Sequence, residues 1–302
     1  MIVEILPFLI VDVIESTVRK RSAKNLIYKP LELYEEKHDF SIIIPAYNAE
    51  KTISETLRRI EKYRKKTIVV DDNSKDRTRK LAEDLGFEVI KHEGNGKKIG
   101  AISLGLENVS SKYTILLDAD SYPEKPELIP RLIGALYDEN LVAGGGQVLP
   151  ANPKSALEKI QYIEYKLAME IGRRSMAKNK RNICISGAFG AFVTKELKEV
   201  VEVQSKSPRF EGEDFERTLY LIERGNVGYF PDFIVRTIVP ESLIELTNQR
   251  IRWGKGYLMT HKEFYKLLKR KDEVGITLIY NWIVNIGLHP FKLISLHFLF
   301  LD

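Results

Sequence analysis

Four short apolar runs alternate with segments of helical spacing between residues 41 and 117. The apolar runs lie at residues 41–44, 66–70, 88–92 and 113–117, and the helical segments between them lie at 49–63, 76–85 and 99–108. Short runs rich in β-branched residues and separated by helices are typical of buried parallel strands joined by crossover connections. The alternation therefore predicts an α/β fold with a doubly wound sheet.

Carboxylates follow directly after two of these apolar runs. They are Asp71 and Asp72 after residues 66–70, and Asp118 and Asp120 after residues 113–117. In open α/β sheets, ligands bind beyond the carboxyl ends of the strands, so these acids stand where a ligand is expected. Side chains two apart on an extended chain point to the same side, and Mg²⁺ or Mn²⁺ prefers carboxylate and phosphate oxygens. A metal site is one explanation of this pair, and solvated turn acids are the more frequent one.

Composition and charge fit one globular domain with appendages at its ends. Of the 302 residues, 44% are hydrophobic and 29% are charged, which leaves enough apolar material for a core. The net charge of +5 is spread over basic clusters mixed with acids, whereas nucleic-acid-binding proteins gather such charge in one stripe. Cys184 is the sole cysteine, so neither an intrachain disulfide nor a cysteine-based zinc site can form. We expect a protein of a reducing compartment with no nucleic-acid partner.

Five motifs follow one another along the chain. They are IIIPAYNAEKTI at 42–53, VVDDNSKD at 69–76, LLDAD at 116–120, GED at 212–214 and QRIRW at 249–253. The set resembles the inverting glycosyltransferases of family 2, in the branch that contains cellulose, chitin and hyaluronan synthases and ceramide glucosyltransferase and shares a D, D, D, QxxRW pattern. One motif could arise by chance, but five in this order on a compatible α/β pattern are specific. The resemblance covers roughly residues 40–260. It implies a GT-A fold, with a mixed, mostly parallel sheet flanked by helices.

On the donor side, the resemblance assigns nucleotide contacts to the loops after the strands. Asp72 matches the acid that accepts a hydrogen bond from the nucleotide base, with Asp71 assisting. The other implied donor residues are Pro45, Tyr47 and Asn48 in the nucleotide pocket, Lys97 in a Gly-Lys element near the nucleotide, and Asp118 and Asp120 at the diphosphate and its Mg²⁺ or Mn²⁺ ion. From the residues alone, Tyr47 could equally be a core aromatic and Lys97 a solvated loop residue.

On the acceptor side, the resemblance makes Asp214 the base that deprotonates the attacking hydroxyl, with Glu213 beside it. Both could also be acids that a helix N-terminus favours. Gly187 and Ala188 match a small-residue segment that lets the acceptor approach the donor. In QRIRW, Gln249, Arg252 and Trp253 share one helix face at i, i+3 and i+4, where the resemblance assigns Arg252 to the diphosphate and Trp253 to stacking on the acceptor sugar. Arg250 is assigned to the same acceptor and diphosphate group.

Both ends of the chain are apolar, and neither reads as a clean membrane span. Residues 1–14 contain Glu4, Pro7 and Asp12, which favours an interfacial helix over a spanning one, and a helix packed on the domain is the alternative. Residues 275–301 are dense in apolar side chains but include Pro290, so they either associate with a membrane or form a packing layer. We expect an N-terminal interfacial helix and linker at 1–38, a glycosyltransferase domain at 39–265 and an apolar membrane-associated segment at 266–302.

The expected function is metal-dependent transfer of a sugar from a nucleotide-sugar, with UDP as the default nucleotide, to a lipid-linked or glycan acceptor. The enzyme would associate with membrane lipids and face the cytoplasm, where nucleotide-sugars are made. No FxVTxK-like gating loop follows the QRIRW region, which favours single-sugar transfer over polymer secretion. The alternatives are a nucleotidyltransferase acting on sugar phosphates and a non-catalytic, membrane-bound nucleotide-binding module. A dehydrogenase is disfavoured because PAYNAE, and not GxGxxG, follows the first strand.

Overall fold

The computed structural model describes residues 29–36, 38–94, 98–173, 180, 182–206, 211–269, 275 and 278–279. Lys97, the predicted helix at 1–14 and nearly all of the apolar segment at 275–301 lie outside these residues. The division into segments 1–38, 39–265 and 266–302 therefore stays a prediction. Within the described ranges, no helix combines the length and apolar character that crossing a bilayer requires.

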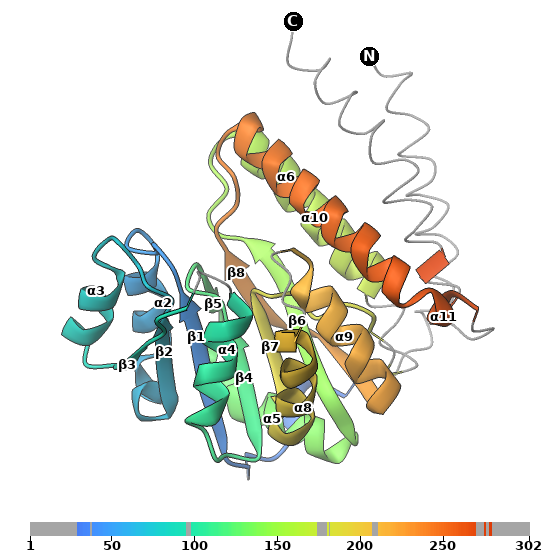
Figure 1. The fold of residues 1–302 in the computed structure, drawn as a ribbon, viewed down its shortest axis with the longest axis horizontal. Helices are drawn as coiled ribbons and strands as arrows, with labels where there is room; N and C mark the ends of the chain where they lie inside the picture. Colours follow the sequence, from blue (N-terminus) through green and yellow to red (C-terminus); the bar gives the residue numbers. More distant parts are fainter. Residues whose placement is uncertain are drawn as a thin grey trace, which may run out of the picture.

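The described strands form one mixed sheet of eight strands in the order β3-β2-β1-β4-β7-β6-β8-β5 (Figure 1). Their bounds are β1 Phe40–Ala46, β2 Thr67–Asp71, β3 Glu88–Lys91, β4 Tyr113–Leu117, β5 Ser121–Pro123, β6 Leu141–Pro150, β7 Phe189–Val193 and β8 Asn226–Thr237. The described α-helices are α2 Ile53–Arg59, α3 Thr78–Asp84, α4 Lys98–Glu107, α5 Ile129–Asp138, α6 Ala156–Leu167, α8 Thr194–Lys206, α9 Glu213–Arg224, α10 Leu243–Glu263 and α11 Tyr265–Leu268.

The first half of the sheet follows the predicted alternation of strands and helices. Strands β3, β2, β1 and β4 pair in parallel, and each coincides with a predicted apolar run to within two residues. The predicted helix at 49–63 is shorter than expected, because α2 ends at Arg59 and a 3₁₀ segment, Glu61–Lys66, replaces its last turns. Ile60, between the two, has φ −113° and ψ 18°, which is not helical.

The second half of the sheet mixes directions. Strand β7 is antiparallel to both β4 and β6, β6 is parallel to β8, and β5 is antiparallel to β8. Two apolar clusters cover the two faces of this sheet. Ile42 and Ile44 of β1 pack in one with α2 and α5, whereas Ile43 packs in the other with α4, α8 and α9. Burial on both faces explains why the central strands are continuous apolar runs.

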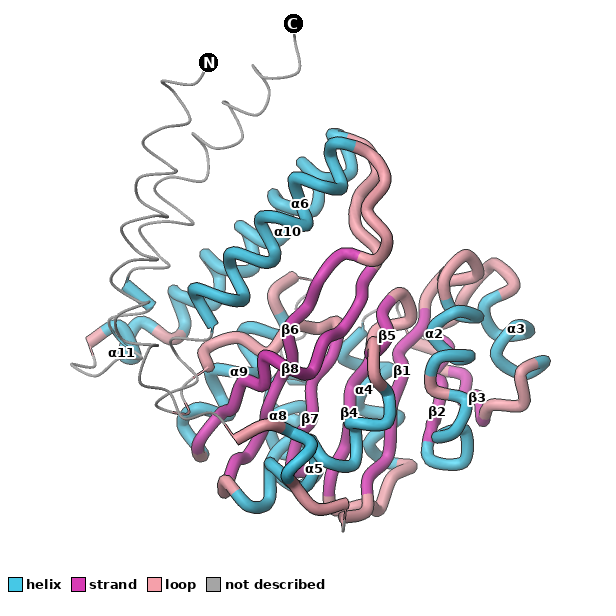
Figure 2. Tube along the Cα trace, turned by 180° about the vertical axis from the view of Figure 1, so that it is seen from behind, coloured by secondary structure: helices cyan, strands magenta, loops and turns pink. Residues whose placement is uncertain are grey.

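Helices α6 and α10 lie side by side and project together beyond the sheet (Figures 1 and 2). They follow β6 and β8, which are parallel neighbours, so both chains leave the sheet at the same edge. Each helix begins with a capping box, formed by Ser155 with Glu158 in α6 and by Ser242 with Glu245 in α10. These caps satisfy the first backbone N–H groups and fix where each helix begins.

Candidate active site

The end of β4 brings Asp118 into contact with a lysine from another element. Asp118 follows the last residue of β4, and its backbone N–H donates to the Ala188 carbonyl at 3.2 Å. Its carboxylate lies 2.5 Å from the Lys98 ammonium. Burial raises the pKa of Asp118 to about 6, Lys98 opposes that rise, and the nearby Asp120 charge adds to it. Asp118 is therefore a half-buried acid in a charged environment.

Lys98 is the first residue of α4 and lies among three acids, which are Asp118, Glu213 and Asp214. Its ammonium is 2.5 Å from Asp118 and 3.4 Å from Glu213. Burial alone would lower the pKa of Lys98, but the charges of Asp118 and Glu213 outweigh burial and hold it above its ordinary value. The lysine is thus a permanent cation in the cluster.

The sequence prediction chose the neighbouring residue, Lys97, which lies outside the described residues. Helical spacing offered a signal for Lys98, because it shares a face with Ile102 and Gly105 at i+4 and i+7. That face packs on the sheet, as a Cβ at Gly105 would lie 2.6 Å from the side chain of Ile43. A side chain at the start of this face is directed toward the strand ends.

Helix α9 supplies the second pair of acids, Glu213 and Asp214, in its first turn. The Oδ2 atom of Asp214 accepts a hydrogen bond from the Gly187 N–H at 2.9 Å. Burial and then the neighbouring Glu213 charge raise the pKa of Asp214. For Glu213, burial acts in the same direction, but Lys98 and Arg217 outweigh it and hold its pKa below the ordinary value. Glu213 is thus ion-paired, and Asp214 binds a proton more readily than a free aspartate does.

Gly187 is the point at which these groups converge. A Cβ at this position would lie 3.0 Å from Lys98 Nζ, 3.4 Å from Asp118 Oδ2 and 3.7 Å from Asp214 Oδ2. Residues from the end of β4, the start of α4 and the start of α9 therefore meet around one residue that has no side chain. Ala188, the next residue, is buried.

Asp118 and Asp120 present a donor set that suits a divalent cation. Asp120 is exposed, and its Oδ1 accepts a hydrogen bond from the Ser121 hydroxyl at 2.9 Å. No three acids, histidines or cysteines among the described residues group as a metal site made by the protein alone. Mg²⁺ and Mn²⁺ need no third protein ligand when substrate phosphates complete the shell. The pair therefore fits a cation that binds together with a phosphorylated substrate.

The predicted base-binding acids lie at the end of β2. Asp71 is the last residue of β2, and Asp72 follows it, and both are buried. Asp71 Oδ1 accepts from the Ser74 N–H at 3.2 Å, and Asp72 Oδ1 lies 2.6 Å from His92 Nδ1. The sequence analysis did not single out His92. A polar residue at the end of the neighbouring predicted run, residues 88–92, was the signal that could have identified it.

The loop after β1 holds the other predicted donor residues. Pro45 lies within β1, and Tyr47 is 55% exposed, which excludes the alternative that it is a core aromatic. Asn48 adopts a φ of +48°, donates its N–H to the Ser74 hydroxyl and accepts from the Lys75 N–H at 2.8 Å. Asparagine tolerates this left-handed conformation better than most residues.

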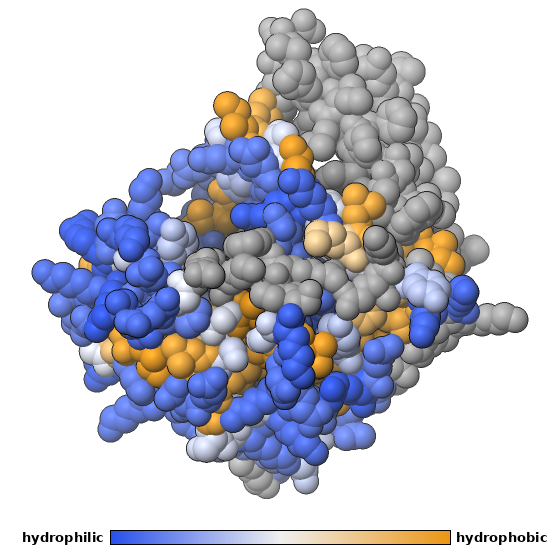
Figure 3. All heavy atoms as spheres, in the orientation of Figure 1, coloured by the Kyte–Doolittle hydropathy of each residue, from blue (hydrophilic) through white to orange (hydrophobic). Residues whose placement is uncertain are grey.

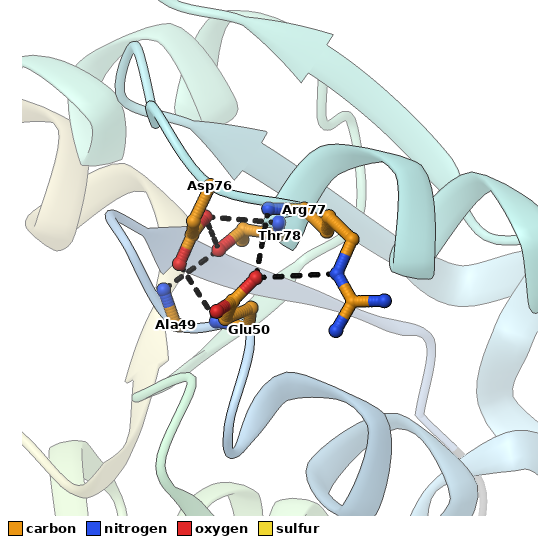
Figure 4. Close-up of polar contacts among 5 residues, drawn as sticks. All are labelled: Ala49, Glu50, Asp76, Arg77 and Thr78. Atoms are coloured by element: carbon orange, nitrogen blue, oxygen red, sulfur yellow. Dashed lines mark hydrogen bonds and ion pairs between the residues drawn. The ribbon is translucent and has the colours of Figure 1, made fainter.

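A polar network fastens the loop after β1 to the loop after β2 (Figure 4). The Ala49 N–H donates to the Thr78 hydroxyl at 2.7 Å, and the Glu50 N–H donates to Asp76 at 3.1 Å. Glu50 accepts from the Arg77 backbone at 3.2 Å in return. These bonds hold the two predicted walls of the donor pocket at a fixed separation.

The QRIRW motif lies on α10, as predicted, but its two arginines have different surroundings. Arg250 is only 7% exposed, donates to Glu164 of α6 at 2.8 Å and lies 4.4 Å from the Trp253 ring centroid. Arg252 is exposed, and Trp253 is 37% exposed. Arg250 thus links α10 to α6, while Arg252 and Trp253 remain available for ligands.

Gln249 is half-buried, and its Oε1 atom has no hydrogen-bond partner in the part of the chain that the structure describes.

The two projecting helices also reach the cluster of acids. The Tyr165 and Trp253 rings lie 6.4 Å apart. Burial raises the pKa of Tyr165 to about 12, Arg250 opposes this rise, and the charges of Glu164 and then Asp120 add to it. A Cβ at Gly256 would lie 2.8 Å from Gly212, the residue before α9. The QRIRW helix therefore packs directly against the element that carries Asp214.

Comparisons with known proteins agree with this arrangement. A family model described as "Glycosyl transferase family 2" matches residues 41–197. Poly-beta-1,6-N-acetyl-D-glucosamine synthase of Staphylococcus aureus (strain COL) is 29% identical over 271 residues, which cover 87% of this chain and 65% of that protein. The chain thus spans slightly less than two thirds of the length of that curated relative.

Solved structures with the same fold include two glycosyltransferases. One is a mannosyltransferase from Pyrobaculum calidifontis in complex with GDP-Man and Mn²⁺, with a TM-score of 0.66, 16% identity, and coverage of 96% of this chain and 83% of that one. The other is glucosyl-3-phosphoglycerate synthase from Mycobacterium tuberculosis with Mn²⁺, UDP and glucosyl-3-phosphoglycerate, with a TM-score of 0.55, 17% identity, and coverage of 78% and 86%. At these identities the likeness concerns the fold, which is of the GT-A type.

Proposed function

The chain belongs to glycosyl transferase family 2, and we propose that it is an inverting enzyme that moves a sugar from a nucleoside diphosphate onto an acceptor hydroxyl at a membrane surface. The observation that carries this proposal is the convergence of Lys98, Asp118 and Asp214 on Gly187. The acid that we propose as a metal ligand and a second acid with a raised pKa then flank one residue that has no side chain. Direct displacement of a diphosphate by a hydroxyl requires both groups in one place.

Each acid has its own task in this mechanism. Asp118 and Asp120 would hold the divalent cation, which when bound neutralises the charge that develops on the departing diphosphate. Lys98 adds a fixed positive charge beside Asp118. Asp214 accepts the proton of the acceptor hydroxyl, and its hydrogen bond from Gly187 fixes one carboxylate oxygen. Attack from the side opposite the leaving group inverts the anomeric carbon.

The donor pocket lies between the loops after β1 and β2. Asp72, assisted by Asp71, accepts a hydrogen bond from the base, and Pro45, Tyr47 and Asn48 line the pocket. The exposed ring of Tyr47 supports this role, because it is free to pack on a ribose or a base. We propose a UDP-sugar as donor and place N-acetylglucosamine first among the sugars to test, since the Staphylococcus relative is named for that sugar.

The acceptor side lies along α10. Trp253 offers an aromatic face to a sugar ring, and Arg252 can reach the diphosphate, with Gln249, Glu213 and Ala188 beside them. Arg250 contacts the indole ring of Trp253 and helps to hold it in position. Because this chain spans 65% of the synthase that it resembles, we extend the proposal only to a lipid-linked or glycan acceptor and not to polymer formation.

Exposed apolar side chains on the projecting helices support attachment to a membrane. They are Ile160, Ile163 and Leu167 on α6, and Ile244, Ile251 and Leu258 on α10. The α10 residues recur every seven positions, so they follow one stripe of the helix. Apolar side chains interrupt the hydrophilic surface over these helices in Figure 3. Apolar residues on a helix that lies in an interface bury themselves at the boundary between headgroups and acyl chains. The catalytic domain would face the cytoplasm, because nucleotide-sugars are made there.

A donor screen tests this proposal. The protein is incubated with Mn²⁺ or Mg²⁺ and either a panel of UDP-, GDP- and dTDP-sugars or nucleoside triphosphates with sugar phosphates, and the released phosphate species is identified. Release of a nucleoside diphosphate that stops with EDTA and in Asp118→Asn supports sugar transfer, whereas pyrophosphate release from a nucleoside triphosphate would replace it with nucleotidyl transfer. Asp138→Asn, at the exposed end of α5, is the matched control and should leave release unchanged.

A further inference from the structure

We propose that His92 is a positioning residue for the nucleotide base. Its imidazole would orient the Asp72 carboxylate so that the donor must carry a base with a ring N–H, namely uracil, thymine or guanine. This inference rests on the proposed function, in which Asp72 accepts a hydrogen bond from the base. It adds a side chain that would set the selectivity of that contact.

The two residues end neighbouring parallel strands. Asp72 follows β2 and His92 follows β3, and the strands pair through Val70 with Ile90 and Asp71 with Lys91. The Asp72 N–H donates to the Ala46 carbonyl and the His92 N–H to the Asp71 carbonyl, each at 2.8 Å. Both main chains are thereby fixed, and the side chains meet with 2.6 Å between Asp72 Oδ1 and His92 Nδ1.

Two glycines lie against the imidazole ring, and the His92 side chain is 21% exposed. A Cβ at Gly94 would lie 2.1 Å from His92 Cε1, and a Cβ at Gly100 would lie 2.7 Å from the same atom. Such distances do not occur between real atoms, so the ring occupies space that only glycine leaves free at both positions. The ring therefore packs against both glycines while its Nδ1 atom contacts Asp72.

The His92 ring also links the base pocket to the acids. Gly100 lies on α4, two residues after Lys98, whose ammonium pairs with Asp118 and Glu213. The helix that packs against His92 thus begins within the proposed diphosphate site. A base held at Asp72 and a diphosphate held at Asp118 are positioned relative to the same helix.

The chemistry of the pair explains its selectivity. An ionised carboxylate has no hydrogen to donate, so His92 Nδ1 carries the hydrogen and donates it to Asp72 Oδ1. The carboxylate that faces the base is then an acceptor only. Uracil and thymine at N3, and guanine at N1, present a ring N–H to such an acceptor, whereas cytosine N3 and adenine N1 present lone pairs that it repels.

Nucleoside monophosphates test the inference without the metal or the diphosphate. Binding of UMP, GMP, CMP and AMP is measured by calorimetry for the wild-type protein, His92→Phe, His92→Gln and the control Lys91→Gln. Lys91 ends β3 next to His92, and its ammonium lies 3.5 Å from Glu93 in an ion pair at the surface. Selectivity is the affinity for the better of UMP and GMP divided by that for the better of CMP and AMP.

The His92→Phe variant keeps an aromatic ring but removes the hydrogen-bond donor. We expect it to lower this selectivity about tenfold to a hundredfold, because that is the range expected for the loss of one hydrogen bond to a charged group. The amide of His92→Gln should restore part of it, and Lys91→Gln should leave it unchanged. Gly100→Ala is a second route, because alanine favours the helix while its Cβ displaces the ring, so the same loss is expected in a folded protein. Thermal melting establishes that each variant is folded.

A nuclear magnetic resonance readout separates positioning from plain packing. The ¹⁵N shifts of His92 should report a hydrogen on Nδ1, and they should change when UMP or GMP binds. Unchanged selectivity in folded His92→Phe and Gly100→Ala would overturn the inference and leave the proposed glycosyltransferase intact. If the wild-type protein bound no nucleotide at all, the proposed function would fall together with the inference.

Discussion

Replacing Gly187 with alanine should separate catalysis from stability. The added methyl group would enter the point where Lys98, Asp118 and Asp214 converge, at 3.0, 3.4 and 3.7 Å from their nearest atoms. The two longer distances are ordinary van der Waals contacts, and the shortest is to the end of a lysine chain that can shift by a few tenths of an ångström. The fold can therefore accept the methyl group.

The magnitude follows from the same geometry. Gly187 does not have a left-handed φ, so alanine brings no backbone strain, and we expect the free energy of unfolding to change by less than about 1 kcal/mol. The reacting atoms of donor and acceptor, however, must occupy the space beside both acids. Displacing them by about 1 Å costs on the order of a hundredfold in rate, or roughly 2.7 kcal/mol of barrier.

The assay compares kcat/KM for nucleoside diphosphate release with urea unfolding of the same preparations. Gly254→Ala is the matched control, because nothing lies within 4 Å of a Cβ at that position of α10, and the gain in helix propensity should leave both rate and fold intact. A Gly187→Ala enzyme with wild-type kcat/KM would refute the reasoning, since it would mean that substrates do not pass between these acids.

Three further outcomes follow from the site. Gly212→Ala should lower the free energy of unfolding by about 1 to 3 kcal/mol, because φ is +73° there and the methyl group would meet the backbone of α10; a urea midpoint equal to wild type would contradict this. Arg250→Met should raise the KM for acceptor and change the emission of Trp253 while donor binding stays constant; a KM shift confined to the donor would speak against it. Because a base acts only when deprotonated, the raised pKa of Asp214 should make kcat/KM fall with decreasing pH at a pH above the ordinary aspartate range. Removing the neighbouring charge with Glu213→Gln should move that limb to lower pH, and a limb that moves upward would exclude the assignment.

The parallel half of the fold could be predicted because its information is local. Central strands buried on both faces appear in the sequence as continuous apolar runs, and β4 begins and ends where its run predicts. The antiparallel half could not be predicted in the same way. The position of β7 between β4 and β6 depends on pairing between residues far apart in sequence, such as Leu117 with Phe189, which no local pattern records.

In the candidate site, too, local sequence predicts some features, whereas others depend on contacts between distant residues. The motifs identified Asp118 and Asp214, and the structure brings both to Gly187. The choice between Lys97 and Lys98 depended on the helix register of α4. Arg250 carries the charge that the motif suggests, but its partner Glu164 lies 86 residues away on α6, so only the packed structure reveals its contact.

The central claim is that Asp214 takes the proton of the acceptor, and the most direct measurement compares wild-type protein with Asp214→Asn under conditions that saturate donor and metal. The account predicts that nucleoside diphosphate release coupled to transfer falls by at least about a hundredfold, while calorimetry gives an unchanged affinity for the donor in Mn²⁺. Full turnover in Asp214→Asn, with its fold and donor binding intact, would contradict the account.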